Sequence, residues 1–125
     1  MKAPITSDKV PTPGGPYSAG LRVGDWIFLS GQGGFDPSTG KVVSDDLAEQ
    51  TEQTFHNIET VLEAGGASLD DVVSCLVHLV DLGDFPAFNA IYGQKFTGVK
   101  PVRTTVRADL VAGLRVEITV VARAS

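Results

Sequence analysis

A length of 125 residues, with 42% hydrophobic and 20% charged residues, predicts one globular domain over residues 1–125 and excludes an intrinsically disordered chain. Fifteen acidic against ten basic residues give a formal charge of −5 without a cluster of Lys or Arg, which argues against a nucleic-acid partner. No apolar stretch reaches the roughly 18 residues that a membrane span needs, and no apolar signal core precedes the domain, so we expect a cytoplasmic protein without a membrane partner.

The first 16 residues are predicted to form an extended arm. Pro and Gly disfavour helix and sheet pairing, and four prolines lie here beside Gly14-Gly15: Pro4, Pro11, Pro13 and Pro16. Two strands should follow, over residues 18–23 and 26–32, because apolar and small residues alternate around Gly24-Asp25, a two-residue loop suited to a hairpin. Residues 31–40 are dense in turn formers and predict a loop.

A helix is predicted over residues 45–64. Apolar side chains recur there at helical spacing, acidic residues stand near its start, and Gly65-Gly66 provides a stop signal. Ser68 and Asp71 then fit a capping box, which predicts one short helical turn.

The chain then becomes almost continuously apolar over residues 72–82. This pattern predicts a strand with both faces covered. A second helix should follow Asp84, because Pro86 is tolerated in a first turn and an apolar stripe runs from Phe85 to Phe96.

Two final strands are predicted over residues 104–108 and 114–122, joined through residues 109–113. The order ββαβαββ indicates an α/β (α+β) fold, with a mixed sheet and two helices packed on one face. The other face of the sheet then stays exposed, and exposed apolar faces usually mark interfaces, so we infer a homo-oligomer.

The final strands carry the most informative polar residues. If they pair with Arg107 opposite Arg115, Thr105 faces Glu117 and Arg103 lies diagonally from it. Arg can hold a carboxylate through two parallel hydrogen bonds, and a carboxylate can position or deprotonate water, so this set suits an anionic substrate. A plain Arg–Glu ion pair between the strands is the alternative interpretation.

Other candidates have structural explanations. Gly31, Gly33 and Gly34 lack the strand-to-helix context of a phosphate loop and indicate a turn. His56 and His78 are too far apart in sequence for a local metal-binding motif, so no metal site is predicted.

Single residues near these segments suggest further roles. Cys75, the only cysteine, lies in an apolar strand and is expected to act as a small buried hydrophobe. Tyr17 follows the flexible arm, so it either closes over a site through its hydroxyl or anchors the arm by its ring.

Short motifs run along nearly the whole chain: Gly15-Pro16-Tyr17-Ser18, Ser30-Gly31-Gln32, Asp81-Leu82-Gly83-Asp84-Phe85, Asn89 with Tyr92, Pro101-Val102-Arg103-Thr104-Thr105-Val106, and Val116-Glu117-Ile118. In order and spacing they resemble the RidA/YjgF family, and the Pro-x-Arg segment followed by the Val-Glu-Ile strand is the most specific part. The resemblance implies a chorismate-mutase-like fold and a homotrimer whose sheets form a central barrel. It also implies three sites in the clefts between subunits.

The activity that the resemblance implies is hydrolysis of reactive 2-enamines and 2-imines, such as 2-aminoacrylate and 2-iminopropionate, to 2-keto acids and ammonia. No cofactor is implied. Arg103 would bind the substrate carboxylate, and Glu117 would hold the attacking water. The pocket would be lined by Tyr17, Ser30, Gly31 through its backbone, Asn89 and Thr105. Many members have a small residue or cysteine where this chain has Thr104 and Thr105, so substrate size and the proton path stay open.

Three further functions fit the same sequence. The cleft around Arg103 would also suit a non-catalytic regulator that binds a small metabolite. An endoribonuclease activity is reported for members of this family, although the acidic charge balance argues against it here. A pathway-specific deaminase, for example of the 2-aminomuconate type, would have the same fold.

Overall fold

The computed structural model describes residues 1–10 and 12–125. Pro11, which belongs to the expected arm, lies outside the described residues. The helices and strands, in chain order, are β1 (Lys2–Pro4), β2 (Gly20–Val23), β3 (Trp26–Leu29), β4 (Gln32–Gly33), α1 (Leu47–Ala64), β5 (Val72–Leu79), α2 (Phe85–Lys95), β6 (Val102–Arg107) and β7 (Val116–Arg123). Short 3-10 turns precede β5 and α2.

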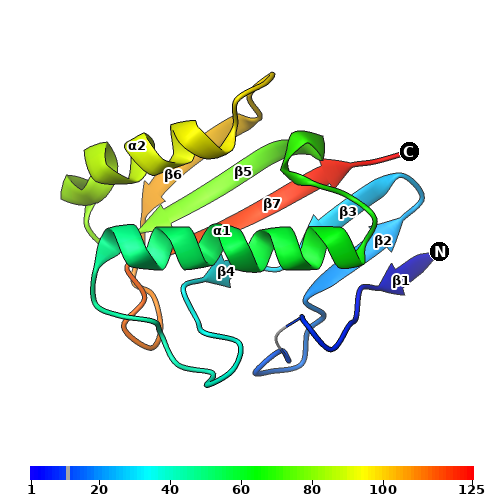
Figure 1. Ribbon diagram of the computed structural model, residues 1–125, viewed down its shortest axis with the longest axis horizontal. Coiled ribbons are helices and arrows are strands. Elements are labelled where there is room, and N and C mark those ends of the chain that lie inside the picture. The colour runs from blue at the N-terminus through cyan, green and yellow to red at the C-terminus, as the bar shows by residue number, and fades with distance from the viewer. Residues whose placement is uncertain (11) are drawn as a thin grey trace.

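Figure 1 shows a two-layer molecule in which α1 and α2 lie on the same face of one sheet. The predicted fold class, a mixed sheet with two helices on one face, is confirmed. Both helices were predicted, and the order ββαβαββ holds with two short strands added, β1 and β4. Within the part of the chain that the structure describes, neither helix is long and apolar enough to cross a membrane.

The sheet has the order β1-β2-β3-β7-β5-β6, with β4 paired to β7. The predicted pairing of the last two strands, with Arg107 opposite Arg115, is wrong because β5 lies between them. β5 pairs parallel with β6 and antiparallel with β7. Burial explains this order: every second residue of β7 is buried, as suits a central strand, whereas β6 has no buried residue and forms the edge.

Helix α1 ends at Ala64, as its sequence predicts, and begins at Leu47, two residues later than predicted. The Asp46 side chain accepts a hydrogen bond from the Glu49 amide at 2.9 Å, which caps the first turn. At the other end, Arg22 from β2 donates to the Gly65 carbonyl oxygen at 2.6 Å. Phe55, Ile58 and other apolar side chains of α1 are fully buried in the core. Such side chains each contribute about 1.5–3 kcal/mol by leaving water.

The second helix covers the sheet near the edge strand. Pro86 stands in its first turn, as predicted, and Phe88, Tyr92 and Phe96 are buried. The predicted short turn before β5 is also present, since the Ser68 amide donates to the Asp71 carboxylate at 2.9 Å.

The face of the sheet opposite the helices is open in the single chain. Trp26, Phe28, Leu76 and Val106 are between 38% and 44% exposed. The strand predicted over residues 72–82 ends at Leu79, and only its helix side is covered within one chain. An apolar sheet face of this kind is typical of a protein–protein interface.

The amino-terminal arm differs in part from its prediction. Lys2–Pro4 forms an edge strand paired antiparallel with β2, despite Pro4. Proline is tolerated on an edge because no further strand needs its missing amide hydrogen. The next residue, Ile5, is buried and donates its amide to the Gly20 carbonyl oxygen at 2.8 Å.

Candidate functional site

The sheet register divides the expected site residues between the two faces. Arg103 and Thr105 pair with Cys75 and Val77, both buried on the helix side of β5. Glu117 pairs with His78, one residue further along β5, and so lies on the open face. The expected juxtaposition of Thr105 with Glu117 is therefore wrong within one chain, and so is a simple Arg103–Glu117 ion pair between neighbouring strands.

Arg103 is held on the helix side by α2. Its Nη1 atom donates to Asn89 Oδ1 at 2.7 Å. The guanidinium carbon lies 4.7 Å from the centre of the Tyr92 ring and 5.3 Å from that of Phe85. Stacking on aromatic rings and the amide contact fix the plane of the guanidinium, which leaves other N–H groups for a bidentate contact with a carboxylate.

Thr105 lies two residues further along the edge strand. Its Oγ1 atom is buried and has no hydrogen-bond partner within the described residues. A buried hydroxyl without a partner is costly, so this atom is suited to accept or donate a bond to a bound molecule. We call Phe85, Asn89, Tyr92, Arg103 and Thr105 the arginine cluster.

Beneath Arg103 lie two groups that do not ionise near neutral pH. Burial raises the pKa of the Cys75 thiol, against smaller opposing effects of the Tyr92 hydroxyl and the Arg103 charge. Burial, followed by contact with Cys75, also raises the pKa of the Tyr92 phenol. The expectation of a buried structural cysteine is confirmed, since Cys75 is 2% exposed.

Glu117 occupies a tight position against a glycine. A Cβ atom added to Gly31 would lie 2.8 Å from both Cδ and Oε1 of Glu117, so only glycine leaves room for this carboxylate. His78 Nδ1 is 3.9 Å from Glu117 Oε1 on the other side. Ser30 precedes this glycine, and its hydroxyl donates to the Ser18 carbonyl oxygen at 2.6 Å. We call Tyr17, Ser30, Gly31, His78 and Glu117 the glutamate cluster.

A hollow of about 550 Å³ opens beside the glutamate cluster. Tyr17, Gly31 and Glu117 line it, as expected, together with apolar residues that sequence analysis did not single out: Phe35, Val111 and Leu114. Tyr17 is 56% exposed, which leaves its ring free to move over the hollow. The structure thus brings together Tyr17, Ser30, Gly31 and Glu117 in one group, and Asn89, Arg103 and Thr105 in another.

Two buried polar residues of α1 were also missed: Asn57 supports the segment around Gly33 and Phe35, and Gln50 supports the segment that leads into β7. Asn57 donates to the carbonyl oxygens of Gly33 and Phe35 at 3.0 and 2.8 Å. Gln50 accepts from the Arg115 amide at 2.7 Å. Their signal in the sequence is the presence of polar side chains on the apolar face of a helix, where they need buried partners.

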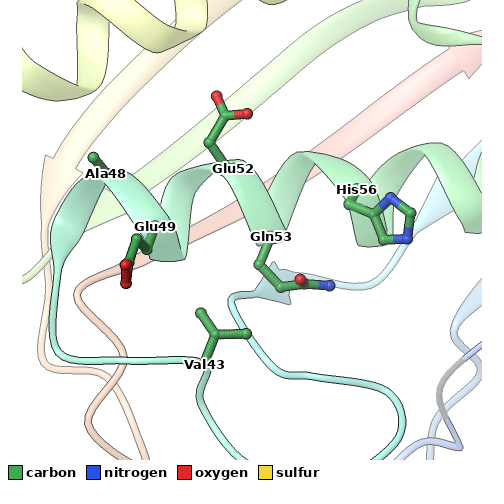
Figure 2. A pocket seen from close by; sticks show the side chains of 6 residues that line it. All are labelled: Val43, Ala48, Glu49, Glu52, Gln53 and His56. Carbon is green, nitrogen blue, oxygen red and sulfur yellow. The ribbon is translucent and has the colours of Figure 1, made fainter.

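Another hollow, of about 520 Å³, lies on the outer side of α1 (Figure 2). Glu49, Glu52 and His56 line it, and none of the expected site residues does. Two carboxylates there would repel an anionic substrate. Within residues 1–10 and 12–125, no group of three or more His, Cys, Asp or Glu side chains is arranged to hold a metal ion.

Comparison with known proteins identifies the family. The model of the family described as "Endoribonuclease L-PSP" matches residues 7–124. A RutC family protein of Saccharolobus solfataricus is 45% identical, with 100% of both chains covered. The 2-iminobutanoate/2-iminopropanoate deaminase of Mus musculus is 39% identical, over 94% of this chain and 88% of the mouse protein.

Solved structures agree with this assignment. A putative endoribonuclease of Thermotoga maritima has a TM-score of 0.95 and 36% identity, with coverage of 100% of this chain and 99% of that one. RidA from an Antarctic Psychrobacter has a TM-score of 0.92 and 38% identity, with coverage of 97% and 98%. The chain therefore belongs to the Endoribonuclease L-PSP family, as a member of its RidA/YjgF group.

Proposed function

We propose that this protein is a cofactor-free deaminase that hydrolyses small 2-imino acids and their 2-enamine tautomers to 2-keto acids and ammonia. The observation that carries the proposal is the oriented guanidinium of Arg103, bound by Asn89 and stacked on Tyr92 with N–H groups left to receive a carboxylate. The mouse relative, named 2-iminobutanoate/2-iminopropanoate deaminase, is consistent with this substrate class.

The site is proposed to lie between subunits. Arg103 and Glu117 face opposite sides of one sheet, so a substrate touching both needs residues from two chains. Arg103 belongs to the edge strand β6, which is free to approach a neighbour, and the open sheet face supplies the apolar contact area. Such a head-to-tail contact closes into a ring, and the family resemblance favours a homotrimer with three sites.

Substrate binding follows from the two clusters. Arg103 holds the carboxylate through two parallel hydrogen bonds, while Asn89 keeps the guanidinium in place and Thr105 Oγ1 offers one more contact. From the neighbouring chain, Tyr17 covers the substrate, and Ser30 and the Gly31 backbone contact its polar atoms. The imine carbon is thereby presented to the water beside Glu117.

A single carboxylate can move both protons of the hydrolysis. Glu117 takes a proton from water as the water oxygen bonds to the imine carbon, and passes this proton to the imine nitrogen, which gives a neutral carbinolamine. Glu117 then takes the proton of the new hydroxyl group and passes it to the amino group, so the C–N bond breaks as the carbonyl forms and ammonia leaves. One imino acid and one water thus become one keto acid and one ammonia.

The test is ammonia release from freshly generated 2-iminopropanoate. We expect acceleration by the wild-type protein, and light scattering should report three chains. A protein that binds the keto acid tightly but does not accelerate ammonia release would instead be a regulator.

A panel of substrates distinguishes this deaminase from a pathway-specific deaminase and from an endoribonuclease. Faster turnover of a larger enamine such as 2-aminomuconate would indicate a pathway-specific deaminase. The acidic net charge of −5 leads us to expect no RNA cleavage, and cleavage retained in Arg103→Ala would point to a separate activity.

A further inference from the structure

His78 stands beside Glu117 on the open face of the sheet. The two residues are register partners on β5 and β7, and His78 Nδ1 lies 3.9 Å from Glu117 Oε1. Their side chains are 22% and 31% exposed. The Nδ1 atom itself is buried and has no hydrogen-bond partner within the described residues.

Among the described neighbours of His78, Glu117 is the one charged residue that its ring can contact. Its neighbours on the same face are apolar or uncharged: Leu76 on β5, Thr104 and Val106 on β6, and Thr119 on β7. Arg115, which comes directly before β7, is directed to Asp45 and Asp84. Within the part of the chain described by the structure, Glu117 is the one carboxylate within 4.0 Å of the His78 ring nitrogens.

A histidine in this row is unexpected on packing grounds. Leu76, its neighbour on the same face of β5, is apolar, and a buried ring nitrogen without a partner costs free energy. The imidazole is therefore better explained by an interaction with Glu117 than by packing. A small rotation of either side chain closes the 3.9 Å separation to hydrogen-bond distance.

We propose that His78 is a positioning residue for Glu117, an inference that rests on the proposed function. When Nδ1 carries a proton, it donates to Oε1 and leaves Oε2 for the attacking water. Glu117 is thus kept in one orientation toward the attacking water.

The kinetic test compares His78→Leu with His78→Asn. Leucine suits the apolar row but removes the donor, whereas the side-chain nitrogen of asparagine occupies nearly the place of Nδ1. We expect about a tenfold lower kcat in His78→Leu, with KM changed less than about twofold, and recovery of most of kcat in His78→Asn.

His56 provides the matched control, since it lies on the outer side of α1 away from both clusters. His56→Leu should leave kcat and KM unchanged. If His78→Leu behaves as His56→Leu does, the positioning role is overturned.

A measurement without substrate separates this inference from the proposed function. The Nδ1 signal of His78 should change its chemical shift in Glu117→Gln relative to the wild-type protein when both are measured at the same pH by nuclear magnetic resonance, while the signals of His56 stay the same. An unchanged His78 signal overturns the pairing, even if the enzyme releases ammonia. Absence of ammonia release from the wild-type protein, with the change in the His78 signal present, contradicts the proposed function and leaves the pairing intact.

Discussion

Arg103 and Glu117 project from opposite faces of one sheet, with β5 between their strands. In the proposed mechanism Arg103 anchors the substrate and Glu117 activates water, and within a single chain these two groups cannot enclose one small molecule. The exposed edge strand and the open apolar face would allow two chains to do so together. The proposed catalytic site therefore requires an oligomer.

Arg103→Lys tests the anchoring role. Lysine keeps the positive charge but lacks the planar fork and cannot stack in the same way on Tyr92. We expect kcat/KM for 2-iminopropanoate to fall about 30- to 1000-fold, or about 2–4 kcal/mol in transition-state binding. Steady-state kinetics measure this, with melting temperature and light scattering as controls for folding and assembly. Wild-type kcat/KM in this variant would remove Arg103 from the site.

Glu117→Gln separates water activation from substrate binding. The amide can still orient a water molecule but is a much poorer proton acceptor, so kcat should fall about 100-fold or more while KM changes little. The same kinetic assay provides the comparison with Arg103→Lys. A rise in KM with kcat unchanged would indicate that Glu117 binds substrate and does not activate water.

Gly31→Ala examines the contact that leaves room for Glu117. The added Cβ would meet the end of the Glu117 side chain at 2.8 Å, and this flexible group can shift. Activity should therefore fall sharply with little change in thermal stability. Gly34→Ala is the matched control, because its Cβ would meet the Gln50 backbone at 2.9 Å and should lower the free energy of unfolding by about 1–3 kcal/mol. Full activity in Gly31→Ala would show that the Glu117 position tolerates displacement.

Cys75 should react slowly with thiol reagents in the native protein. It is 2% exposed, and burial raises its pKa, so the reactive thiolate is rarer at any given pH than for a free cysteine. Alkylation by iodoacetamide at pH 8 is expected to be at least about tenfold slower than in the denatured chain, and to quicken as pH rises. Rapid native alkylation would mean that the thiol is accessible beneath Arg103.

The sequence predicts the helices well and the sheet order poorly. Residues 45–64 carry a helical period, acidic residues near the start and a glycine stop, and all three signals are local. β6 and β7 follow one another in the sequence but do not form a hairpin. The strand that each of them pairs with depends on how much surface each strand buries in the folded chain.

The same limit applies to the site. Arg103, Glu117 and Gly31 stand out by residue type, but their distribution over two faces follows from the strand order. Gln50 and Asn57 escaped notice because these partners lie in distant segments of the chain, 65 and 24 residues away. Local patterns do not encode such contacts.

Mixed trimers give the most direct test of the shared site. Arg103→Ala and Glu117→Gln chains are coexpressed with different tags, and trimers that contain both kinds of chain are purified. Each variant alone is expected to be nearly inactive. If each site takes Arg103 from one chain and Glu117 from its neighbour, every mixed ring regains about one intact site in three, and ammonia release from 2-iminopropanoate should recover in proportion. Mixed trimers no more active than the two parent variants would contradict the shared site, because sites contained within one chain always keep one of the two substitutions.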